Sequence, residues 1–548
     1  MDQILSVASP VNEPTILETG NGEAVLDFGE HRVNNDLDLA NFGYVEELKR
    51  EFTLFSAFSF AVSISGLMAT IATTFIYPLA AGGSAAVVWC WVISGAGCLC
   101  IAFSVAEIVS AYPTSGGVYY ACAKMVPEQY APIICWIDGW INLLGQIAGV
   151  ASTDYGCAQL LLAAVQMGTD GSYTPTTHHV VGTMAAILIF HGLVNSFPTK
   201  YLERITNFYV IFHFGCLIAG SIALLVVTKD KHSASYVFTN VEAQTGWSPP
   251  GFSFLFGFLS VSWVMTDYDA TAHICEEMTR PATQAPWAIS TAMMFTYGLG
   301  IVYNIILVFC MGDATEILGA AQPVAQIYYN SLGKQAGVFF TVAMFIILNF
   351  VGVTALQASS RTTWAQARDN MLPLSKLWYK VNPVTNTPIY AVWMNTTLCI
   401  AMNLIALGSA TAINAIFSVC AIALDWSYVI PIISKILFPH LFKKGPWNMG
   451  RFSVLVNAWA SIWTLFVSII FILPNYKPVT AQNMNYAIVI FVGIISLSVL
   501  FWYLGGNKYY HGPQSNVTVV EPSQIQKSES VEETDRSSIA VESSLDAK

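Results

Sequence analysis

The stretch Phe52–Ala106 constrains the fold most, because it contains no Asp, Glu, Lys or Arg. A membrane-spanning helix needs about 20 mainly apolar residues. The stretch therefore predicts two such helices, divided at Ala81-Gly82-Gly83. Charged residues make up 10% of the chain, against about 25% in soluble domains, so a lipid bilayer is the expected surrounding.

Further apolar runs predict an all-α integral membrane protein with twelve transmembrane helices. Eleven or thirteen spans remain alternatives, because 389–437 is one long run divided only by Gly408. The other ten predicted spans are 130–165, 180–198, 205–227, 252–275, 287–311, 335–358, 389–408, 411–437, 453–474 and 485–505.

The net charge of −11 resides in the two ends of the chain. Residues 1–51 hold 11 acidic and 3 basic residues and lack the features of a signal peptide, so we expect an acidic cytosolic tail. Residues 508–548 hold 7 acidic and 4 basic residues; this serine- and glutamate-rich tail is predicted to be cytosolic and disordered. The balanced core between the tails offers no basic surface for nucleic acid.

The distribution of Lys and Arg predicts the orientation. With the amino terminus inside, twelve basic residues fall in inner loops and helix ends and four in outer loops. An even number of spans then places both termini in the cytosol. The plasma membrane is the expected location, with the vacuole or another endomembrane as the alternative.

The composition also bears on enzyme chemistry and cofactors. The eleven cysteines lie in or beside apolar runs and have no zinc-like spacing, so we expect neither a metal nor another cofactor. No nucleotide loop or nucleophile–base arrangement is recognisable, so an enzyme is not expected.

Span six carries the sharpest polar cluster, Trp263-Val-Met-Thr266-Asp267-Tyr268-Asp269. Two carboxylates two residues apart cannot share one helical face. A break in the helix, opening on a cavity, would relieve this conflict. Because ionisable residues within spans are costly, we predict a substrate or coupling-ion site here. A structural hydrogen-bond hub is the alternative.

Span one has a matching sequence of small residues, Ser63-Ile64-Ser65-Gly66. Such residues also serve ordinary helix packing. However, spans one and six stand first in two successive five-helix halves, and paired breaks at such positions indicate a binding site. The freed N–H groups of span one would suit a carboxylate, and the acidic break of span six would suit a cation.

Polar residues of spans three and five are weaker candidates. Asn142 and Gln146 share a face, and Asp154 lies further out, where it could face an outer vestibule. Each is more often a tether between helices than a ligand. His213 could carry a coupling proton or simply pack. Asp154, His213 and Asp269 are therefore the candidates for proton coupling.

Several separated motifs together carry a family resemblance. The chain resembles the amino acid–polyamine–organocation superfamily, and within it the fungal amino acid/choline transporter branch that contains the γ-aminobutyrate (GABA) permeases. The resemblance covers roughly residues 40–505. The motifs are Gly43-Tyr44 to Arg50, Ala106-Glu107 with Ala111 to Gly117, Tyr268-Asp269 with His273 and Glu276-Glu277, Ala367 to Asn370 with Leu372-Pro373, Gly445-Pro446-Trp447, and Asn483 to Tyr486.

The resemblance implies a five-plus-five inverted-repeat fold, with a transport core over 52–437 and two peripheral helices over 438–507. It also implies alternating access and proton-driven uptake. Ser65 and Gly66 would bind a carboxylate, and the span-six cluster an amine. Span five lacks the lysine that carries the proton in some relatives, and His213 takes its place by position. Gating residues at the cytosolic mouth would be Glu107, Glu276, Glu277, Arg368 and Asp369.

The acidic and aromatic break favours a solute with an amine, since an ammonium gains from aromatic faces and carboxylates. A zwitterion such as γ-aminobutyrate would use both breaks, whereas choline, thiamine or a polyamine would use mainly the acidic one. A nutrient sensor with little transport is the alternative of another class, and saturable uptake would separate the two. Ubiquitin-ligase adaptors are conceivable partners of the tails.

Overall fold

The computed structural model describes residues 15–18, 24–27, 42, 44, 47–408, 413–481 and 483–513. The chain separates into two compact units, Met1–Glu46 with Gln514–Lys548, and Glu47–Pro513. In the first unit the described residues form an antiparallel strand pair, β1 (Thr15–Glu18) and β2 (Ala24–Asp27). Most of both predicted tails, including any binding site for ubiquitin-ligase adaptors, lies outside the described residues.

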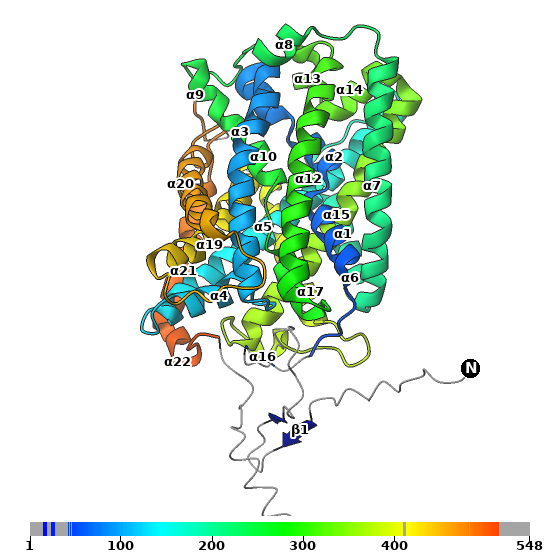
Figure 1. The fold of residues 1–548 in the computed structure, drawn as a ribbon. Helices are drawn as coiled ribbons and strands as arrows, with labels where there is room; N and C mark the ends of the chain where they lie inside the picture. Colours follow the sequence, from blue (N-terminus) through cyan, green and yellow to red (C-terminus); the bar gives the residue numbers. More distant parts are fainter. Residues whose placement is uncertain are drawn as a thin grey trace, which may run out of the picture. The chain divides into compact units, whose positions relative to one another are not determined.

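The second unit is a bundle of helices that run along one common direction (Figure 1). Its described residues contain eleven helices that are long and apolar enough to cross a membrane. A shorter apolar helix, Pro250–Val264, begins the predicted span six. The predicted all-α membrane fold is therefore confirmed, and counting this shorter helix as part of span six agrees with the predicted number of twelve.

Most spans are unbroken or nearly so. They are α3 (Ile76–Ala111), α5 (Ala131–Gly168), α6 (Thr177–Asn195), α7 (Thr199–Val227), α12 (Pro281–Phe309), α15 (Lys334–Arg368), α17 (Ile389–Asn403) continued by α18 (Ile405–Gly408), α19 (Ile413–Leu437), α20 (Ser453–Phe471) and α21 (Ala487–Phe501).

Spans one and six are interrupted. Span one consists of α1 (Leu54–Ser65) and α2 (Leu67–Thr74). Span six consists of α9 (Pro250–Phe254), η2 (Leu255–Gly257), α10 (Phe258–Val264), α11 (Ala270–His273) and η3 (Cys275–Glu277). Both predicted breaks are therefore present.

The predicted division at Ala81-Gly82-Gly83 appears as a kink within α3. Gly82 and Gly83 leave helical geometry, and Gly83 has φ 68° and ψ −156°, a region open mainly to glycine. A Cβ on Gly83 would also lie 3.0 Å from the Glu242 backbone nitrogen. Glycine is thus required at the kink that separates the first residues of α3 from the rest of this helix.

Short elements connect the spans at the two ends of the bundle. They are α4 (Gly117–Met125), α8 (Ala234–Thr239), α13 (Ala314–Gly319), α14 (Pro323–Leu332), α16 (Ser375–Trp378), η4 (Gly450–Phe452), η5 (Trp502–Gly506) and α22 (Asn507–Tyr509). Helices α4, α16 and α22 mark one end, which we call the α16 end (Figure 1).

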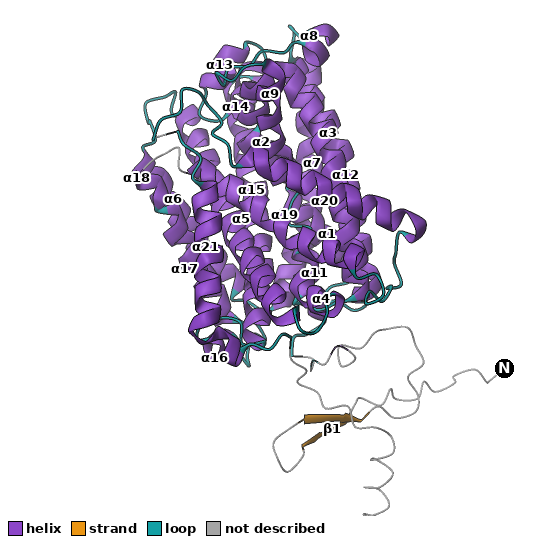
Figure 2. Ribbon diagram, turned by 90° about the vertical axis from the view of Figure 1, so that its left-hand side faces the viewer, coloured by secondary structure: helices purple, strands orange, loops and turns teal. Residues whose placement is uncertain are grey.

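The long helices α5 and α15 pack against each other in the middle of the bundle (Figure 2). Peripheral spans instead expose large apolar side chains, such as Phe190 on α6 and Ile211 and Val226 on α7. Exposed apolar area of this extent suits contact with lipid tails. The central pair therefore forms the polar-lined interior against which the broken spans lie.

Candidate functional site

The break in span one depends on Gly66. This residue has φ 47° and ψ 36° and separates α1 from α2. A Cβ at this position would lie 2.2 Å from Val351 Cγ2 of α15. Both the left-handed backbone and the close contact therefore require glycine.

The residues around Gly66 present backbone and hydroxyl groups to one another. The Ser65 carbonyl accepts a hydrogen bond from Thr70 Oγ1 at 2.7 Å. The Ser65 hydroxyl is buried without a hydrogen bond to a described residue. Ser63 instead lies 3.2 Å from Thr354 Oγ1 of α15, so its hydroxyl contacts span eight and not the break.

The break in span six lies between Val264 and Ala270, and Asp267 takes a left-handed φ of 62° there. A non-glycine residue with positive φ is uncommon and is often found at functional sites. Trp263 precedes the break: its Nε1 donates to Ser152 Oγ at 3.0 Å, and its ring centroid is 4.9 Å from that of Phe417.

A small cavity of about 30 Å³ lies between the two breaks. It has room for little more than a water molecule, so this conformation is closed around the site. Asp267 is the only carboxylate among its lining residues, which all lie in the described part of the chain. They are Ile64, Thr70, Gly149, Thr153, Trp263, Thr266, Asp267, Val351, Ala355, Cys420 and Leu424.

The two span-six carboxylates have different surroundings. Asp267 lines the cavity, is half-buried, and accepts a hydrogen bond from Gln146 Nε2 at 2.6 Å. Asp269 is fully buried and does not line the cavity. It accepts hydrogen bonds from Asn142 Nδ2 at 2.7 Å and from the Tyr428 hydroxyl at 2.6 Å. Gln146 Nε2 also lies 3.3 Å from Asp269 Oδ1.

The predicted shared face of Asn142 and Gln146 is therefore real, since both reach span six from α5. Tyr268, between the two carboxylates, turns away from the cavity. Its ring centroid lies 5.4 Å from that of Tyr428, and it is not among the lining residues. Of the predicted amine-binding residues, Trp263, Thr266 and Asp267 line the cavity, and Tyr268 and Asp269 do not.

His273 is a site residue for which the sequence analysis predicts no binding role. Its Nε2 lies 3.0 Å from Asp269 Oδ2, and its Nδ1 lies 2.9 Å from the Ser115 carbonyl oxygen. A carbonyl oxygen cannot donate, so Nδ1 carries a proton. The Nε2–Oδ2 contact then requires a second proton, on one atom or the other. The spacing of four residues from Asp269 places both on one helical face and could have revealed the pair.

Asp154 lies beside a second histidine, although neither its carboxylate oxygens nor His191 Nδ1 has a hydrogen bond to a described residue. Its Oδ1 lies 2.8 Å from Nδ1 of His191 on α6, and His191 Nε2 lies 3.1 Å from Asn349 Oδ1 on α15. Both Asp154 and His191 are fully buried. The expected outer vestibule is therefore not what Asp154 faces, because the neighbouring histidine of span four covers it.

His213 of α7 contacts the break in span one. Its Nε2 accepts a hydrogen bond from the Met68 backbone N–H at 3.3 Å, in the first turn of α2. An accepting nitrogen carries no proton, so the imidazole is neutral in this conformation. His213 thus lies beside the site without lining the cavity.

The five predicted gating residues lie in ion pairs or hydrogen bonds toward the α16 end. Glu276 accepts two hydrogen bonds from Arg368, at 2.9 and 3.0 Å. Tyr119 donates to Asp369 at 2.8 Å. These contacts join α4 and η3 to the end of α15 and the residue that follows it.

Two further pairs close the same end. Glu277 pairs with Arg361 at 2.7 Å, and Glu107 with Lys435 at 2.5 Å. Arg361 and Lys435 were missed as partners, because each lies far along the chain from its carboxylate. Buried pairs of this kind are costly to break once formed.

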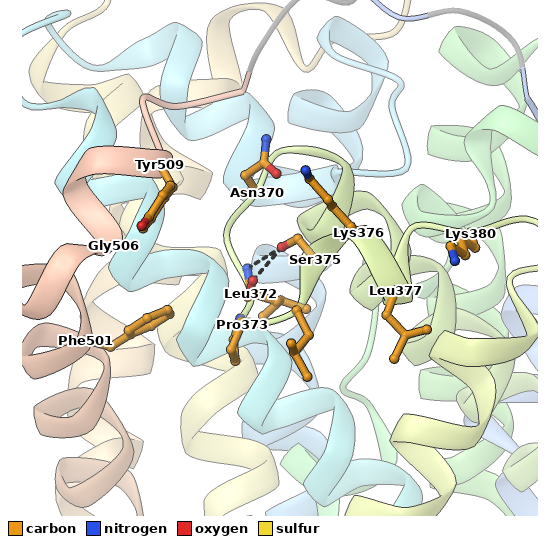
Figure 3. A pocket seen from close by; sticks show the side chains of 11 residues that line it. Asn370, Leu372, Pro373, Ser375, Lys376, Leu377, Lys380, Phe501, Gly506 and Tyr509 are labelled. Carbon is orange, nitrogen blue, oxygen red and sulfur yellow. Dashed lines mark hydrogen bonds between the residues drawn. The ribbon is translucent and has the colours of Figure 1, made fainter.

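A larger pocket, about 690 Å³, lies away from the helix breaks (Figure 3). It is formed by the segment after α15 and by the end of α21. Its lining contains Lys376 and Lys380 but no carboxylate. A pocket with this charge does not suit an amine, so the small cavity is the better candidate site.

A helical membrane protein whose first and sixth spans break around a buried, acidic cavity has the architecture of a secondary transporter. The chain belongs to the amino acid permease family, whose sequence model matches residues 52–494. It is thus a transporter and not an enzyme, and the predicted superfamily is confirmed.

Known relatives agree with this assignment. An amino-acid permease of Schizosaccharomyces pombe is 56% identical over 89% of this chain and 91% of its own length. Amino-acid permease 2 of Neurospora crassa is 46% identical, over 88% of this chain and 89% of its own length. Amino-acid permease BAT1 of Arabidopsis thaliana is 31% identical, over 90% and 98% respectively.

Proposed function

We propose that this permease takes up a small zwitterionic amino acid, such as γ-aminobutyrate, together with protons by alternating access. The observation that carries the proposal is the position of Asp267, the carboxylate that lines the cavity between the two breaks. The solute's ammonium pairs with Asp267 beside the Trp263 ring. An aromatic face adds about 0.5–2 kcal/mol to the binding of a desolvated cation.

The solute's carboxylate lies at the other break, against the first turn of α2. The positive end of a helix stabilises an anion by about 0.3–1 kcal/mol, and more when partly buried. His213 occupies the Met68 N–H in the closed conformation, so the carboxylate replaces the imidazole there. Choline, thiamine or a polyamine would leave this end of the site unused.

The ion pairs of Glu276, Glu277 and Glu107 form the cytosolic gate. The α16 end then faces the cytosol, in agreement with the excess of basic residues on the inner side. The plasma membrane is the proposed location, with both termini in the cytosol.

Uptake by proteoliposomes containing the full chain tests the assignment. The solutes are γ-aminobutyrate, proline, basic amino acids, choline, thiamine and putrescine. Zwitterions should enter saturably and compete with one another. Preferred uptake of choline or putrescine would refute the two-ended site.

Asp267→Asn tests the amine-binding position. Removing one partner of a buried charge pair costs about 2–5 kcal/mol, which corresponds to about a 30-fold or greater increase in KM. Asp170→Asn is the matched control, because Asp170 is 70% exposed and pairs with Lys334 at the start of α15. Equal KM values for the two variants would show that the amine binds elsewhere.

A further inference from the structure

The bundle contains two pairs of a buried aspartate and a buried histidine, and the two pairs lie at different positions. In each pair one imidazole nitrogen faces a carboxylate. The other nitrogen faces a carbonyl oxygen, from Ser115 for His273 and from Asn349 for His191. Asn349 Nδ2 donates to the Phe345 carbonyl at 2.8 Å, which orients Oδ1 toward His191. The hydrogen bonds of the Asp269–His273 pair therefore require one proton beyond that of a neutral histidine beside a carboxylate. The Asp154–His191 contact is not a hydrogen bond and requires no such proton.

The pairs differ in which helices they join. Asp154, His191 and Asn349 belong to α5, α6 and α15, three unbroken spans that pack on one another. Asp269 and His273 belong to the broken span six. Their partners come from α5, α19 and the segment before α4. If the broken spans move against the unbroken ones during transport, only the contacts of the Asp269–His273 pair change.

We propose that the Asp269–His273 pair is the proton-binding site that couples the proton gradient to amino acid uptake. The proposal rests on the transport function proposed above and adds its coupling site. In this proposal His273 shares the coupling proton with Asp269, a carboxylate that the amino acid itself does not contact.

The position of the pair suits this role. Gln146 Nε2 contacts both Asp267 Oδ1 and Asp269 Oδ1, so the pair lies one side chain away from the amine position. On its other side, Ser115 accepts from His273 through its carbonyl and donates its N–H to Glu276 Oε1 at 3.0 Å. Glu276 belongs to the proposed gate. The pair thus lies between the cavity and the gate.

Charge balance explains why the amino acid and the proton would travel together. Asp267 and Asp269 bring two negative charges to one buried region. A bound ammonium offsets one charge, and a proton on the pair offsets the other, while α2 faces the carboxylate. Burying an uncompensated charge costs several kcal/mol. The site therefore closes around the amino acid at low cost only when the proton is bound as well.

Other titratable and charged groups surround the pair. Asp138 on α5 and Asp425 on α19 are buried and form no ion pair with a described residue, so we count both as neutral acids. From α15, Arg361 and Arg368 are already engaged by Glu277 and Glu276. Tyr428 donates to Asp269. Helix α1, which also packs on α11, carries no charged residue.

Two assays with proteoliposomes separate coupling from binding. Accumulation driven by an imposed pH gradient needs the coupled proton, whereas counterflow exchange of the amino acid needs no net proton movement. His273→Gln should reduce accumulation to the equilibrium ratio of 1 and should retain counterflow. His191→Gln, the matched change in the second pair, should retain accumulation.

Three results would overturn the proposal. One is accumulation by His273→Gln at the wild-type level, and another is loss of accumulation in His191→Gln alone. Wild-type protein that shows counterflow but no accumulation in response to the pH gradient would also overturn the coupling proposal. That result would leave the proposed amino acid transport standing. Absence of counterflow in wild type would instead refute the transport function itself.

Tyr428→Phe provides a second variant that leaves the pair in place. Loss of one hydrogen bond to the Asp269 carboxylate makes the pair hold its proton more tightly. The pH of half-maximal uptake should rise by about one unit, the equivalent of one hydrogen bond to a charged group. An unchanged pH profile, in a variant that retains counterflow, would contradict the assignment.

Discussion

The Arg361–Glu277 ion pair should contribute most to the stability of the α16 end. Both side chains are fully buried, and Arg361 Nε lies 2.7 Å from Glu277 Oε1. The second carboxylate oxygen has no hydrogen bond to a described residue. Arg361→Met retains much of the side-chain volume and removes the cation. Glu277 would then be a buried charge without a partner, at a cost of about 3–5 kcal/mol.

The assay is chemical unfolding of the detergent-solubilised protein, arranged as a double-mutant cycle. Replacing both partners, Arg361→Met with Glu277→Leu, removes the unpaired charge, so most of the lost free energy of unfolding should return. Lys334→Met is the control, since the Lys334–Asp170 pair has side chains 40% and 70% exposed. It should cost no more than about 1 kcal/mol. A double variant as unstable as Arg361→Met alone would refute the reasoning.

Two further predictions concern the break and the entrance to span one. Gly66→Ala should abolish uptake, because the added Cβ would lie 2.2 Å from Val351 and the left-handed backbone would be strained by about 1–2 kcal/mol. Uptake that returns when Val351→Ala is added would show that the backbone conformation of Gly66 is not needed for transport. Glu47, which Tyr379 contacts as a hydrogen-bond donor, has its pKa raised by burial from 4.5. The folded protein therefore binds this proton more tightly than the unfolded chain, and stability falls as pH rises above 4.5. In thermal unfolding, Glu47→Gln should be more stable than wild type at pH 7, and this difference in stability should disappear toward pH 4.5. An equal difference at both pH values would contradict the raised pKa of Glu47.

Much of the fold could be predicted from the sequence, because the decisive signals are local. A charge-free run of sufficient length predicts a span wherever it occurs, and Gly82-Gly83 marks a kink in the first of these runs. The conflict between Asp267 and Asp269 correctly predicts a broken helix. Each of these inferences needs only residues within one turn or one span.

The division of roles between the two carboxylates could not be predicted in this way. It depends on the left-handed φ of 62° at Asp267, which directs one carboxylate into the cavity and leaves the next inside the protein. The partners of Asp269 come from α5, α19 and the segment before α4, and no local pattern connects Tyr428 or Ser115 with span six. Only the pairing of His273 with Asp269 could have been predicted, because a spacing of four residues places both on one helical face.

The charges of the bundle also explain why the solute should be an amine. Glu276, Glu277 and Glu107 each have a basic partner, and Asp154 and Asp269 each have a histidine. Asp267 differs, because its hydrogen-bond donor is the neutral amide of Gln146 and it lines the cavity. A carboxylate in a buried site is stabilised most by a cation in direct contact. In the proposed function, the ammonium of the transported solute supplies that cation and completes the charge of the closed site.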